Sequence, residues 1–311
     1  MDKGKDINTK KAPQGHPSDS TTPVYVYVNG DVVAEDEAAV SIRDRGFLYG
    51  DAVFETLRSY NGNPFLLKDH LERLLASADA LGMQTERTVE EQLGRAVRRL
   101  LDLNKLKDAY IRITLTGGRG RDGKGGLLPS GPQRPTVIIE NRAFKPYSDE
   151  LYTKGMRFII SDYRRSTSNP ITYHKTANFL VAITARQEAL KKNADDALLL
   201  NTNEEVCEGT VWNVFMVEGG GVITPSVETN LLPGITRKTV IEICGRMGIP
   251  AGEEAFPAER LLKADEVFVT NSLAEIMPVA AIDDCRIGGK IPGKLTRRLM
   301  DAYKELTLTP A

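Results

Sequence analysis

Lys175 is the residue of this chain whose local sequence best suits covalent chemistry. It stands in ITYHKTANFLVAI, directly after Tyr173 and His174 and ahead of an apolar segment expected to be helical. Partial burial there would lower its pKa toward the neutral amine that attacks a carbonyl carbon. Because most lysines are solvated surface charges, these residues alone favour an ordinary surface lysine.

Two other segments could bind a phosphate. Arg73, in KDHLERLLASA, lies one turn beyond His70 and could hold a phosphate through two hydrogen bonds or form a common salt bridge. In NLLPGITRKTV a Pro-Gly turn precedes a helix whose first N–H groups, at Ile235 and Thr236, could point at a phosphate. Taken by itself, the second pattern is more often a plain junction between a loop and a helix.

Glu208 and a basic segment complete the candidates. Glu208, in EVCEGTVWNVF, is either a buried partner for a protonated nitrogen or a surface turn residue. The Gly-, Arg- and Lys-rich segment 117–134 could bind phosphate or RNA, but it lacks interleaved aromatic residues. It is better interpreted as a mobile loop at the entrance of a site.

Composition narrows the class of protein. The 311 residues include 41 basic and 42 acidic side chains, so no net charge favours nucleic acid or an anionic membrane. Three well-separated cysteines and three histidines exclude a disulfide framework and most metal sites and Ser-His-Asp triads. No apolar run approaches a membrane span or a signal peptide. We therefore expect a cytoplasmic protein that binds small molecules.

The elements that would position these residues alternate between strands and helices. Residues 1–22 have the composition of a disordered tail. Alternation over 24–28 predicts a strand, with Asn29-Gly30 as a hairpin turn. Helical spacing predicts helices over 67–82 and after a capping box at Thr88 and Glu91. AYIRITLT and TVIIEN are predicted strands on either side of the basic loop.

The second half mixes the same elements without an internal repeat. Strands are predicted at GMRFIIS, DDALLLN, WNVFMV, GVIT and EVFVTNS, and helices over 176–192, 235–247 and the C-terminal segment. The charged, Pro-containing segment 141–150 is the best interdomain linker. It divides the chain into a small α/β domain, 23–140, and a larger domain, 151–307.

Seven ordered segments together resemble the class IV aminotransferases. They are DRGFLYGDAVFETLRSYNG, the HLERL helix, AYIRI, HKTANFL, CEGTVWNVF, LLPGITR and VTNSLAEIMPV. The resemblance runs from about Val24 to Leu306. It implies an α+β (mixed α/β) fold of two domains, fold type IV, with pyridoxal 5'-phosphate between the domains, and a homodimer or higher homo-oligomer.

The resemblance assigns roles to individual residues. Lys175 would form a Schiff base with the cofactor and then carry a proton between the substrate α-carbon and the cofactor. Glu208 would pair with the pyridine nitrogen and keep it protonated. The phosphate would be held by the remaining cofactor residues, Arg73, the Ile235 and Thr236 amides and Ser272.

The substrate residues of the resemblance give a mixed pattern. Tyr110 and Arg112 match the YxR of branched-chain transaminases, which favours transfer from a branched-chain L-amino acid to 2-oxoglutarate. Thr56, after Phe54 and Glu55, instead resembles 4-amino-4-deoxychorismate lyases, and Leu180 replaces a tyrosine usual in branched-chain enzymes. Leu273 is a further expected substrate contact.

Two other functions stay open. D-amino acid transaminases usually carry an arginine and a histidine after the AYIRI strand, and 113–134 contains no histidine. That subtype is therefore the third alternative. A non-enzymatic, cofactor-binding regulatory protein is the fourth, because cofactor residues can persist after substrate residues change.

Overall fold

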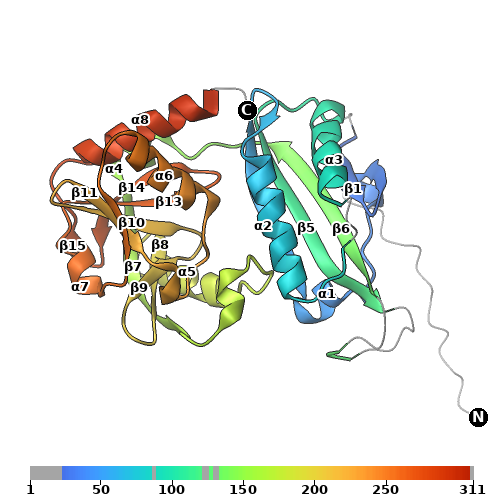
Figure 1. Cartoon of the computed structure of the whole chain (residues 1–311), viewed down its shortest axis with the longest axis horizontal. Helices are drawn as coiled ribbons and strands as arrows, with labels where there is room; N and C mark the ends of the chain where they lie inside the picture. Colours follow the sequence, from blue (N-terminus) through green and yellow to red (C-terminus); the bar gives the residue numbers. More distant parts are fainter. Residues whose placement is uncertain (1–22, 86–88, 121–125, 129–132, 309–311) are drawn as a thin grey trace, which may run out of the picture.

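The computed structural model describes residues 23–85, 89–120, 126–128 and 133–308. The expected tail, 1–22, and Thr88 of the expected capping box lie outside these ranges, as does much of the basic loop. Two units, each built around one sheet, lie side by side (Figure 1). The expected α+β class is confirmed.

The first unit is a six-stranded antiparallel sheet with two helices on one face (Figure 1). The strand order is β2-β1-β6-β5-β3-β4. The strands are β1 (Tyr25–Val28), β2 (Asp31–Ala34), β3 (Ala52–Tyr60), β4 (Asn63–Pro64), β5 (Ala109–Gly120) and β6 (Gln133–Ala143). The short helix α1 (Arg45–Tyr49) precedes β3, and α2 (Leu67–Ala80) and α3 (Val89–Leu103) cover the sheet.

Local sequence explains these elements. Asn29 and Gly30 have φ of 53° and 110°, the left-handed conformations that a tight hairpin turn requires, and β1 and β2 pair on either side as expected. The leucines of α2 lie at helical spacing and pack on alternate residues of the strands, such as Val53 and Leu57 of β3 and Ile111 of β5. The opposite face of β3 carries Phe54 and Thr56.

The second unit is a mixed nine-stranded sheet that closes on itself. Its order is β12-β11-β10-β13-β14-β7-β8-β9, with β15 beside β14, and β9 also pairs with β10. The strands are β7 (Met156–Arg165), β8 (Asp196–Asn201), β9 (Val206–Gly209), β10 (Asn213–Glu218), β11 (Gly221–Pro225), β12 (Ala251–Glu254), β13 (Glu266–Asn271), β14 (Glu275–Ile282) and β15 (Cys285–Arg286). Its helices are α4 (Asp149–Lys154), α5 (Leu180–Lys191), α6 (Ile235–Arg246), α7 (Ala258–Leu261) and α8 (Lys294–Leu308).

Two expectations differ from the structure. The helix expected over 176–192 begins at Leu180, because Thr176 and Ala177 pair with β3 in extended form. The loop expected over 117–134 is shorter, since β5 continues to Gly120 and β6 begins at Gln133. A bulge between Thr116 and Arg119 lets the ladder continue through two glycines.

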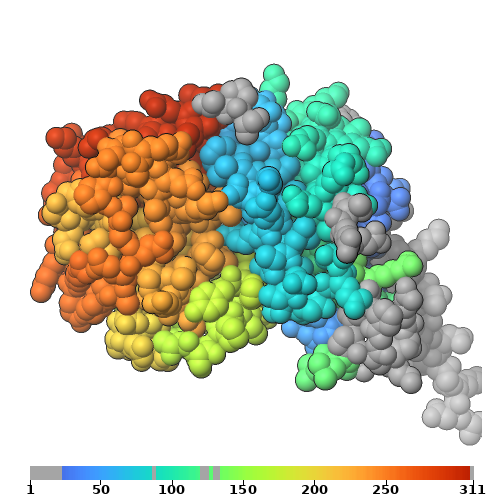
Figure 2. Space-filling view, in the orientation of Figure 1, coloured from blue at the N-terminus to red at the C-terminus, as the bar shows by residue number. Residues whose placement is uncertain are grey.

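The connection between the units is short. β6 ends at Ala143, where it still pairs with β5, and α4 begins at Asp149. Helix α2 lies directly against the second unit, beside α6 (Figure 2), where Lys238 Nζ is 2.8 Å from Asp69 Oδ1. The candidate residues of both units therefore meet along one boundary.

Candidate active site

Lys175 lies at this boundary on an extended segment. Its carbonyl oxygen accepts a hydrogen bond of 2.9 Å from the Phe54 N–H, and the next residue, Thr176, forms a bridge with Val53. The short strand β4 pairs only with the far end of β3, so this end of β3 is free to bind the segment. The backbone pairing fixes the position of the lysine relative to the first unit.

Two aromatic rings surround the Lys175 amine. Its Nζ lies 4.6 Å from the centroid of the Phe54 ring and 6.0 Å from that of Phe179. The two rings contact each other with centroids 5.4 Å apart. Such rings exclude water from the amine, and their faces still attract the amine when it is charged.

The charges around Lys175 partly cancel. Burial lowers its pKa to about 8. The carboxylates of Glu55 and Glu208 oppose this change, and the guanidinium groups of Arg73 and Arg112 add to it. With a pKa near 8, roughly a tenth of the amines are neutral at pH 7, and the neutral amine is the form that acts as a nucleophile or base.

Arg73 is held by a buried carboxylate. Glu55 is fully buried and accepts hydrogen bonds of 2.7 Å from Arg73 Nε and Nη2, one on each oxygen. His70 Nδ1 lies 2.7 Å from Glu55 Oε2. Burial alone would raise the Glu55 pKa, but Arg73 and His70 outweigh it and lower the pKa to about 2. The salt-bridge alternative for Arg73 is thus present, and it fixes the guanidinium in one orientation.

Arg73 also reaches the second unit. Its Nη1 donates to the Pro233 carbonyl at 2.9 Å, two residues before α6 begins. The N-cap residue of α6, Gly234, has no side chain that could bind the first N–H groups. The amides of Ile235 and Thr236 are therefore left for another acceptor beyond the helix end.

Gly234 is required by a close contact. A Cβ at this position would lie 2.0 Å from Asn213 Oδ1. The Asn213 side chain in turn donates to the Leu232 carbonyl at 2.8 Å and to Glu208 Oε2 at 3.3 Å. The start of α6 and the carboxylate of Glu208 are consequently positioned by the same side chain.

Glu208 is a buried carboxylate, as one of its two interpretations predicts. It pairs with Arg165 Nη1 at 2.8 Å and accepts the Leu232 N–H at 3.2 Å. Burial raises the Glu208 pKa, and the Arg165 charge and the Leu232 N–H reduce that rise. The carboxylate keeps acceptor capacity for one further N–H group.

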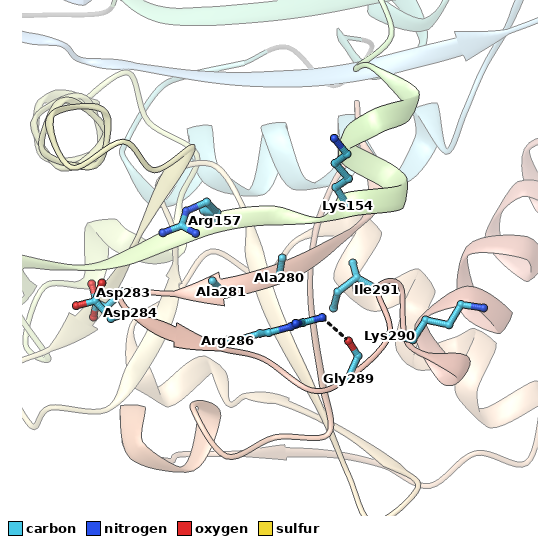
Figure 3. A pocket seen from close by; sticks show the side chains of 10 residues that line it. All are labelled: Lys154, Arg157, Ala280, Ala281, Asp283, Asp284, Arg286, Gly289, Lys290 and Ile291. Atoms are coloured by element: carbon cyan, nitrogen blue, oxygen red, sulfur yellow. Dashed lines mark hydrogen bonds between the residues drawn. The ribbon is translucent and has the colours of Figure 1, made fainter.

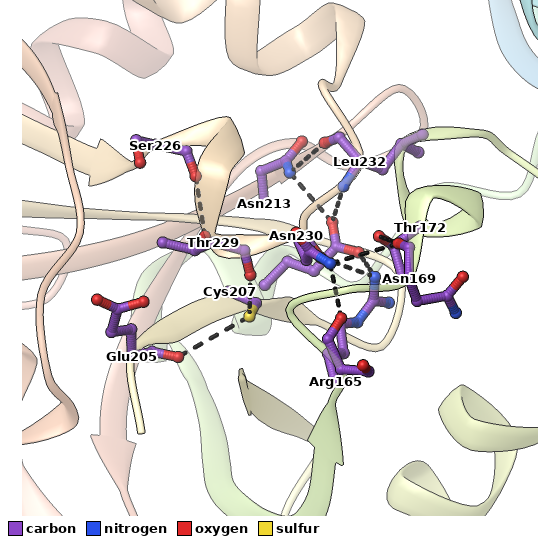
Figure 4. Close-up of polar contacts among 12 residues, drawn as sticks. Arg165, Asn169, Thr172, Glu205, Cys207, Asn213, Ser226, Thr229, Asn230 and Leu232 are labelled. Atoms are coloured by element: carbon purple, nitrogen blue, oxygen red, sulfur yellow. Dashed lines mark hydrogen bonds and ion pairs between the residues drawn. The ribbon is translucent and has the colours of Figure 1, made fainter. Parts of the chain in front are cut away.

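Asn230 connects this carboxylate to the lysine segment (Figure 4). Its side-chain amide donates to the Ser166 carbonyl at 2.6 Å and to the Asn169 carbonyl at 3.3 Å, and Tyr173 donates to its oxygen at 2.9 Å. Its own carbonyl is 3.4 Å from Arg165 Nη1. The fully buried Asn230 therefore holds the chain just before Lys175 against the loop that precedes α6.

Four of the five predicted substrate residues share one face of the first sheet. Thr56 pairs directly with Arg112, and Phe54 and Tyr110 lie one pleat away on the same face. The Arg112 guanidinium stacks 3.7 Å above the Phe54 ring and donates to Thr114 Oγ1 at 3.2 Å. Among the described residues, no carboxylate lies within salt-bridge distance of Arg112. A substrate carboxylate could fill that position.

Ser272 and Leu273 lie in the turn between β13 and β14. Asn271 Oδ1 accepts the N–H groups of Leu273 and Ala274, at 3.0 and 2.8 Å, which keeps the turn compact. The preceding strand pairs with β10 next to Asn213. The turn thus follows the strand next to β10, whose Asn213 side chain donates to the Leu232 carbonyl in the loop before α6.

Three important residues were not among the sequence candidates. Glu55 appeared only beside Phe54 and Thr56, Asn230 only as the first residue of NLLPGITRKTV, and Arg165 lies beyond the predicted strand GMRFIIS. Each acts through a partner far away in the chain, so no local pattern marks it. Only Glu55 gave a signal in the sequence. It stands among apolar residues of a strand, and a carboxylate buried there needs a partner.

A different pocket lies elsewhere on the second unit (Figure 3). It is an open pocket of about 640 Å³ between α4, β14 and the segment after β15. Its lining contains none of the predicted site residues, and its basic side chains, such as Arg157 and Lys290, are accompanied by Asp283 and Asp284. Within the described ranges there is no cluster of metal-binding side chains and no helix that could cross a membrane.

Comparison with known proteins identifies the family. The model of the family "Amino-transferase class IV" matches residues 52–282. A putative branched-chain-amino-acid aminotransferase of Methanocaldococcus jannaschii is 38% identical over 284 residues, covering 90% of this chain and 96% of that protein. The chain belongs to the class IV aminotransferases.

Relatives with other activities are similarly close. The aminodeoxychorismate lyase of Bacillus subtilis is 34% identical over 281 residues, and the D-alanine aminotransferase of Staphylococcus epidermidis is 33% identical over 281 residues. Each alignment covers 90% of this chain, with 94% of the lyase and 96% of the aminotransferase. Sequence identity alone therefore does not select the substrate.

Solved structures support the same fold. The branched-chain amino acid aminotransferase of Escherichia coli superimposes with a TM-score of 0.87 at 29% identity, covering 92% of this chain and 95% of that one. The branched-chain aminotransferase of the archaeon Thermoproteus uzoniensis, solved with norvaline, gives 0.84 at 34% identity, with the same coverage of each chain. The fold is that of the fold type IV enzymes.

The residues of this chain fit the cofactor of the family, pyridoxal phosphate, whose aminated form is bound in another solved branched-chain aminotransferase of this fold. Three of these groups lie along one boundary between the units. They are Lys175 with its lowered pKa, the buried Glu208 carboxylate with acceptor capacity left, and the Arg73 guanidinium held by Glu55. The uncapped start of α6 adds unpaired N–H groups beside Pro233. These groups match an aldehyde, a protonated ring nitrogen and a phosphate.

Proposed function

We propose that this enzyme transfers the amino group of a branched-chain L-amino acid to 2-oxoglutarate. The observation that carries the proposal is the position of Arg112. It is a cation close enough to affect the Lys175 pKa, it stacks on Phe54, and it has no carboxylate partner among the described residues. A substrate with a second carboxylate would supply that partner.

The apolar rings beside Lys175 suit the other substrate. Phe54 and Phe179 offer hydrocarbon surface to a branched aliphatic side chain at the same place. Tyr110 lies beside Arg112 on the sheet face and would help to receive the carboxylate of the amino donor. Leu273, from the second unit, would contact the substrate from the opposite side.

The chain's own residues would perform the following tasks. Pyridoxal phosphate, when bound, draws electrons from the α-carbon of the amino donor. Lys175 would hold the cofactor covalently and, once displaced, carry the α-proton from the amino donor to the cofactor. Glu208 would accept a hydrogen bond from the ring N–H and keep that nitrogen protonated. Arg165, bound to the same carboxylate, opposes the rise of the Glu208 pKa that burial causes.

The phosphate would be held from both units. Arg73, fixed by Glu55, supplies a guanidinium from the first unit, and the amides of Ile235 and Thr236 with the Ser272 hydroxyl supply donors from the second. Groups held in place before binding cost less to order when the ligand arrives. This assignment is supported by the donors that each unit presents at the boundary, which are Arg73 in the first unit and the start of α6 in the second.

A second candidate is a 4-amino-4-deoxychorismate lyase. Thr56 faces the same side as Phe54 and Arg112, and the relative from Bacillus subtilis carries that name. Leu180, which replaces the tyrosine usual in branched-chain enzymes, is 77% exposed at the start of α5. D-alanine transfer is the third candidate, named by the Staphylococcus relatives, and a cofactor-binding regulatory protein is the fourth.

We further propose that the chain forms a homodimer and is divided into two domains. Exposed apolar residues lie on α1 and α5, including Phe47 at 73% and Leu180 at 77% exposure, and we propose that they are covered in a homodimer. Residues 141–150 would link the domains 23–140 and 151–307. We also propose a cytoplasmic enzyme that acts on small amino and 2-oxo acids and not on nucleic acid.

One set of incubations tests the function. Leucine with 2-oxoglutarate should give glutamate and 4-methyl-2-oxopentanoate, while aminodeoxychorismate should give no pyruvate and D-alanine should be a poor donor. Pyruvate and 4-aminobenzoate from aminodeoxychorismate, with no glutamate from leucine, would replace the proposal by the lyase. An absorption spectrum that no amino donor changes would support the regulatory protein instead.

A further inference from the structure

Glu275 has a backbone conformation that is unfavourable for a residue with a side chain. It is the first residue of β14 and has a φ of 62°, in the left-handed region where glycine is favoured. A non-glycine residue there costs on the order of 1 kcal/mol. The cost is tolerated where the side chain forms contacts that a glycine cannot form.

Those contacts cross the boundary between the two units. Glu275 Oε1 accepts the Tyr60 hydroxyl at 2.8 Å and lies 3.2 Å from Arg58 Nη1, both on β3 of the first unit. The side chains of Arg58 and Glu275 are only 18% and 22% exposed. Arg58 is further enclosed by two rings, with its Cζ 4.3 Å from the Tyr60 centroid and 3.9 Å from that of Phe144 in the connecting segment.

A second chain of contacts leads from Tyr60 to the start of α6. The Tyr60 and Phe65 rings meet edge to face with centroids 5.7 Å apart, and Phe65 contacts Tyr303 of α8 at 5.8 Å. Tyr303 is buried and hydrogen-bonded to the Thr236 side chain. The same tyrosine of β3 is therefore connected to both parts of the second unit from which we propose phosphate donors.

The turn itself is attached on its other side as well. Tyr152 of α4 donates to the Ala274 carbonyl at 3.1 Å, and Asn271 Nδ2 lies 3.4 Å from the Val211 carbonyl. Within the turn, Asn271 binds the N–H groups of Leu273 and Ala274. Glu275 thus joins to the first unit a turn that Tyr152 and Asn271 attach to the second.

We propose that Arg58, Tyr60 and Glu275 form an interdomain clasp that positions the 271–275 turn for cofactor binding. The proposal rests on the cofactor roles given above for Ser272, Thr236 and Arg73. The phosphate donors come from both units, so their separation must be fixed before the cofactor arrives. The clasp fixes it, and its three members are positioning residues that do not themselves touch the cofactor.

Glu275→Gly is the central test, because glycine suits the backbone at this position and removes only the side-chain contacts. Glu204→Gly is the matched control. Glu204 has a φ of 63° and an ion pair with an arginine, Arg164, but its side chain is 63% exposed and both partners belong to the second unit. Pyridoxal phosphate would be titrated into cofactor-free protein and followed by absorbance and protein fluorescence.

We expect Glu275→Gly to raise the Kd for pyridoxal phosphate roughly tenfold, the size of a lost charge-assisted hydrogen bond. Glu204→Gly should change it by less than about twofold. Tyr60→Phe, which keeps the ring and loses one hydrogen bond, should raise it about threefold. A Glu275→Gly affinity within about twofold of the wild type would overturn the proposal.

A double-mutant cycle shows whether Arg58 and Glu275 affect cofactor binding through their contact with each other. Arg58→Met and Glu275→Gly together should weaken binding no more than the stronger single change, because either one already breaks the pair. Effects that multiply would contradict the clasp. Cofactor binding needs no amino donor, so this result is independent of the branched-chain assignment.

Amide hydrogen exchange gives a readout without any cofactor. In cofactor-free protein the Leu273 and Ala274 amides should exchange at least about tenfold faster in Glu275→Gly than in Glu204→Gly, since the turn loses its attachment. Unchanged exchange would overturn the clasp even if the proposed cofactor roles are correct. Faster exchange with unchanged cofactor affinity would support the attachment and reject its role in binding.

Discussion

Lys175 should destabilise the cofactor-free protein at neutral pH, and its replacement by methionine should therefore stabilise the fold. Burial lowers the Lys175 pKa from 10.5 to about 8, so the folded state disfavours the charged amine. At about 1.36 kcal/mol for each pH unit, that difference corresponds to about 3 kcal/mol. Methionine keeps most of the apolar stem and removes the charge.

The expected gain is smaller than the full value. The ammonium group lies 4.6 Å from the Phe54 centroid, an attraction of about 0.5 to 1 kcal/mol that methionine loses in part. We therefore expect Lys175→Met to raise the free energy of unfolding by about 1 to 3 kcal/mol at pH 7. Functional residues often carry such a cost to stability.

The pH dependence has a definite sign. A base whose pKa is lowered on folding destabilises the folded state fully below pH 8, and the penalty disappears as the pH rises from about 8 to 10.5. The difference between Lys175→Met and the wild type should therefore be constant from about pH 6 to 7.5 and shrink toward pH 10. Urea unfolding of the cofactor-free proteins measures it.

Lys304→Met is the control, because Lys304 is exposed on α8 and its replacement should change stability by less than about 0.5 kcal/mol. A Lys175→Met protein that is no more stable than the wild type at pH 7 would refute the argument. A gain that grows between about pH 7.5 and 10 would refute it equally, since it would have the wrong sign.

The remaining predictions concern the groups around the lysine. Arg73→Ala should weaken pyridoxal phosphate affinity by at least about tenfold in a titration while leaving the ranking of amino donors unchanged, because its proposed contact is with phosphate. Glu55→Gln should lower the free energy of unfolding by about 3 kcal/mol at pH 7 in urea, and the difference should vanish as the pH falls from 4.5 toward 2, where the wild-type carboxylate also becomes protonated. Arg112→Met should raise the KM for 2-oxoglutarate at least about tenfold in steady-state assays and change that for leucine less, and equal changes would remove Arg112 from the distal carboxylate. Gly234→Ala should displace Asn213, whose Oδ1 would be 2.0 Å from the new Cβ, and lower stability by about 1 to 3 kcal/mol by thermal unfolding.

The sequence predicted the parts of this molecule that local patterns determine. The β1–β2 hairpin follows from Asn29-Gly30, and α2 and α6 follow from helical spacing and a Pro-Gly start. The order of motifs also identified the family, which the comparisons confirm. These features depend on residues close together in the chain.

The sequence did not predict interactions between distant segments. The helix after Lys175 begins late because Thr176 pairs with Val53, a residue far earlier in the chain. The Glu55–Arg73 and Arg165–Glu208 pairs and the contacts of Glu275 arise the same way. Such pairings are set by the packing of the two units, which no local spacing encodes.

The covalent link between Lys175 and pyridoxal phosphate is the central claim, and borohydride reduction followed by peptide mapping tests it most directly. In the wild type, one phosphopyridoxyl group should appear on the peptide that contains Lys175. In Lys175→Ala, which should retain the fold, no peptide should carry it. A label on another lysine of the wild type, or an equal label in the variant, would contradict the account.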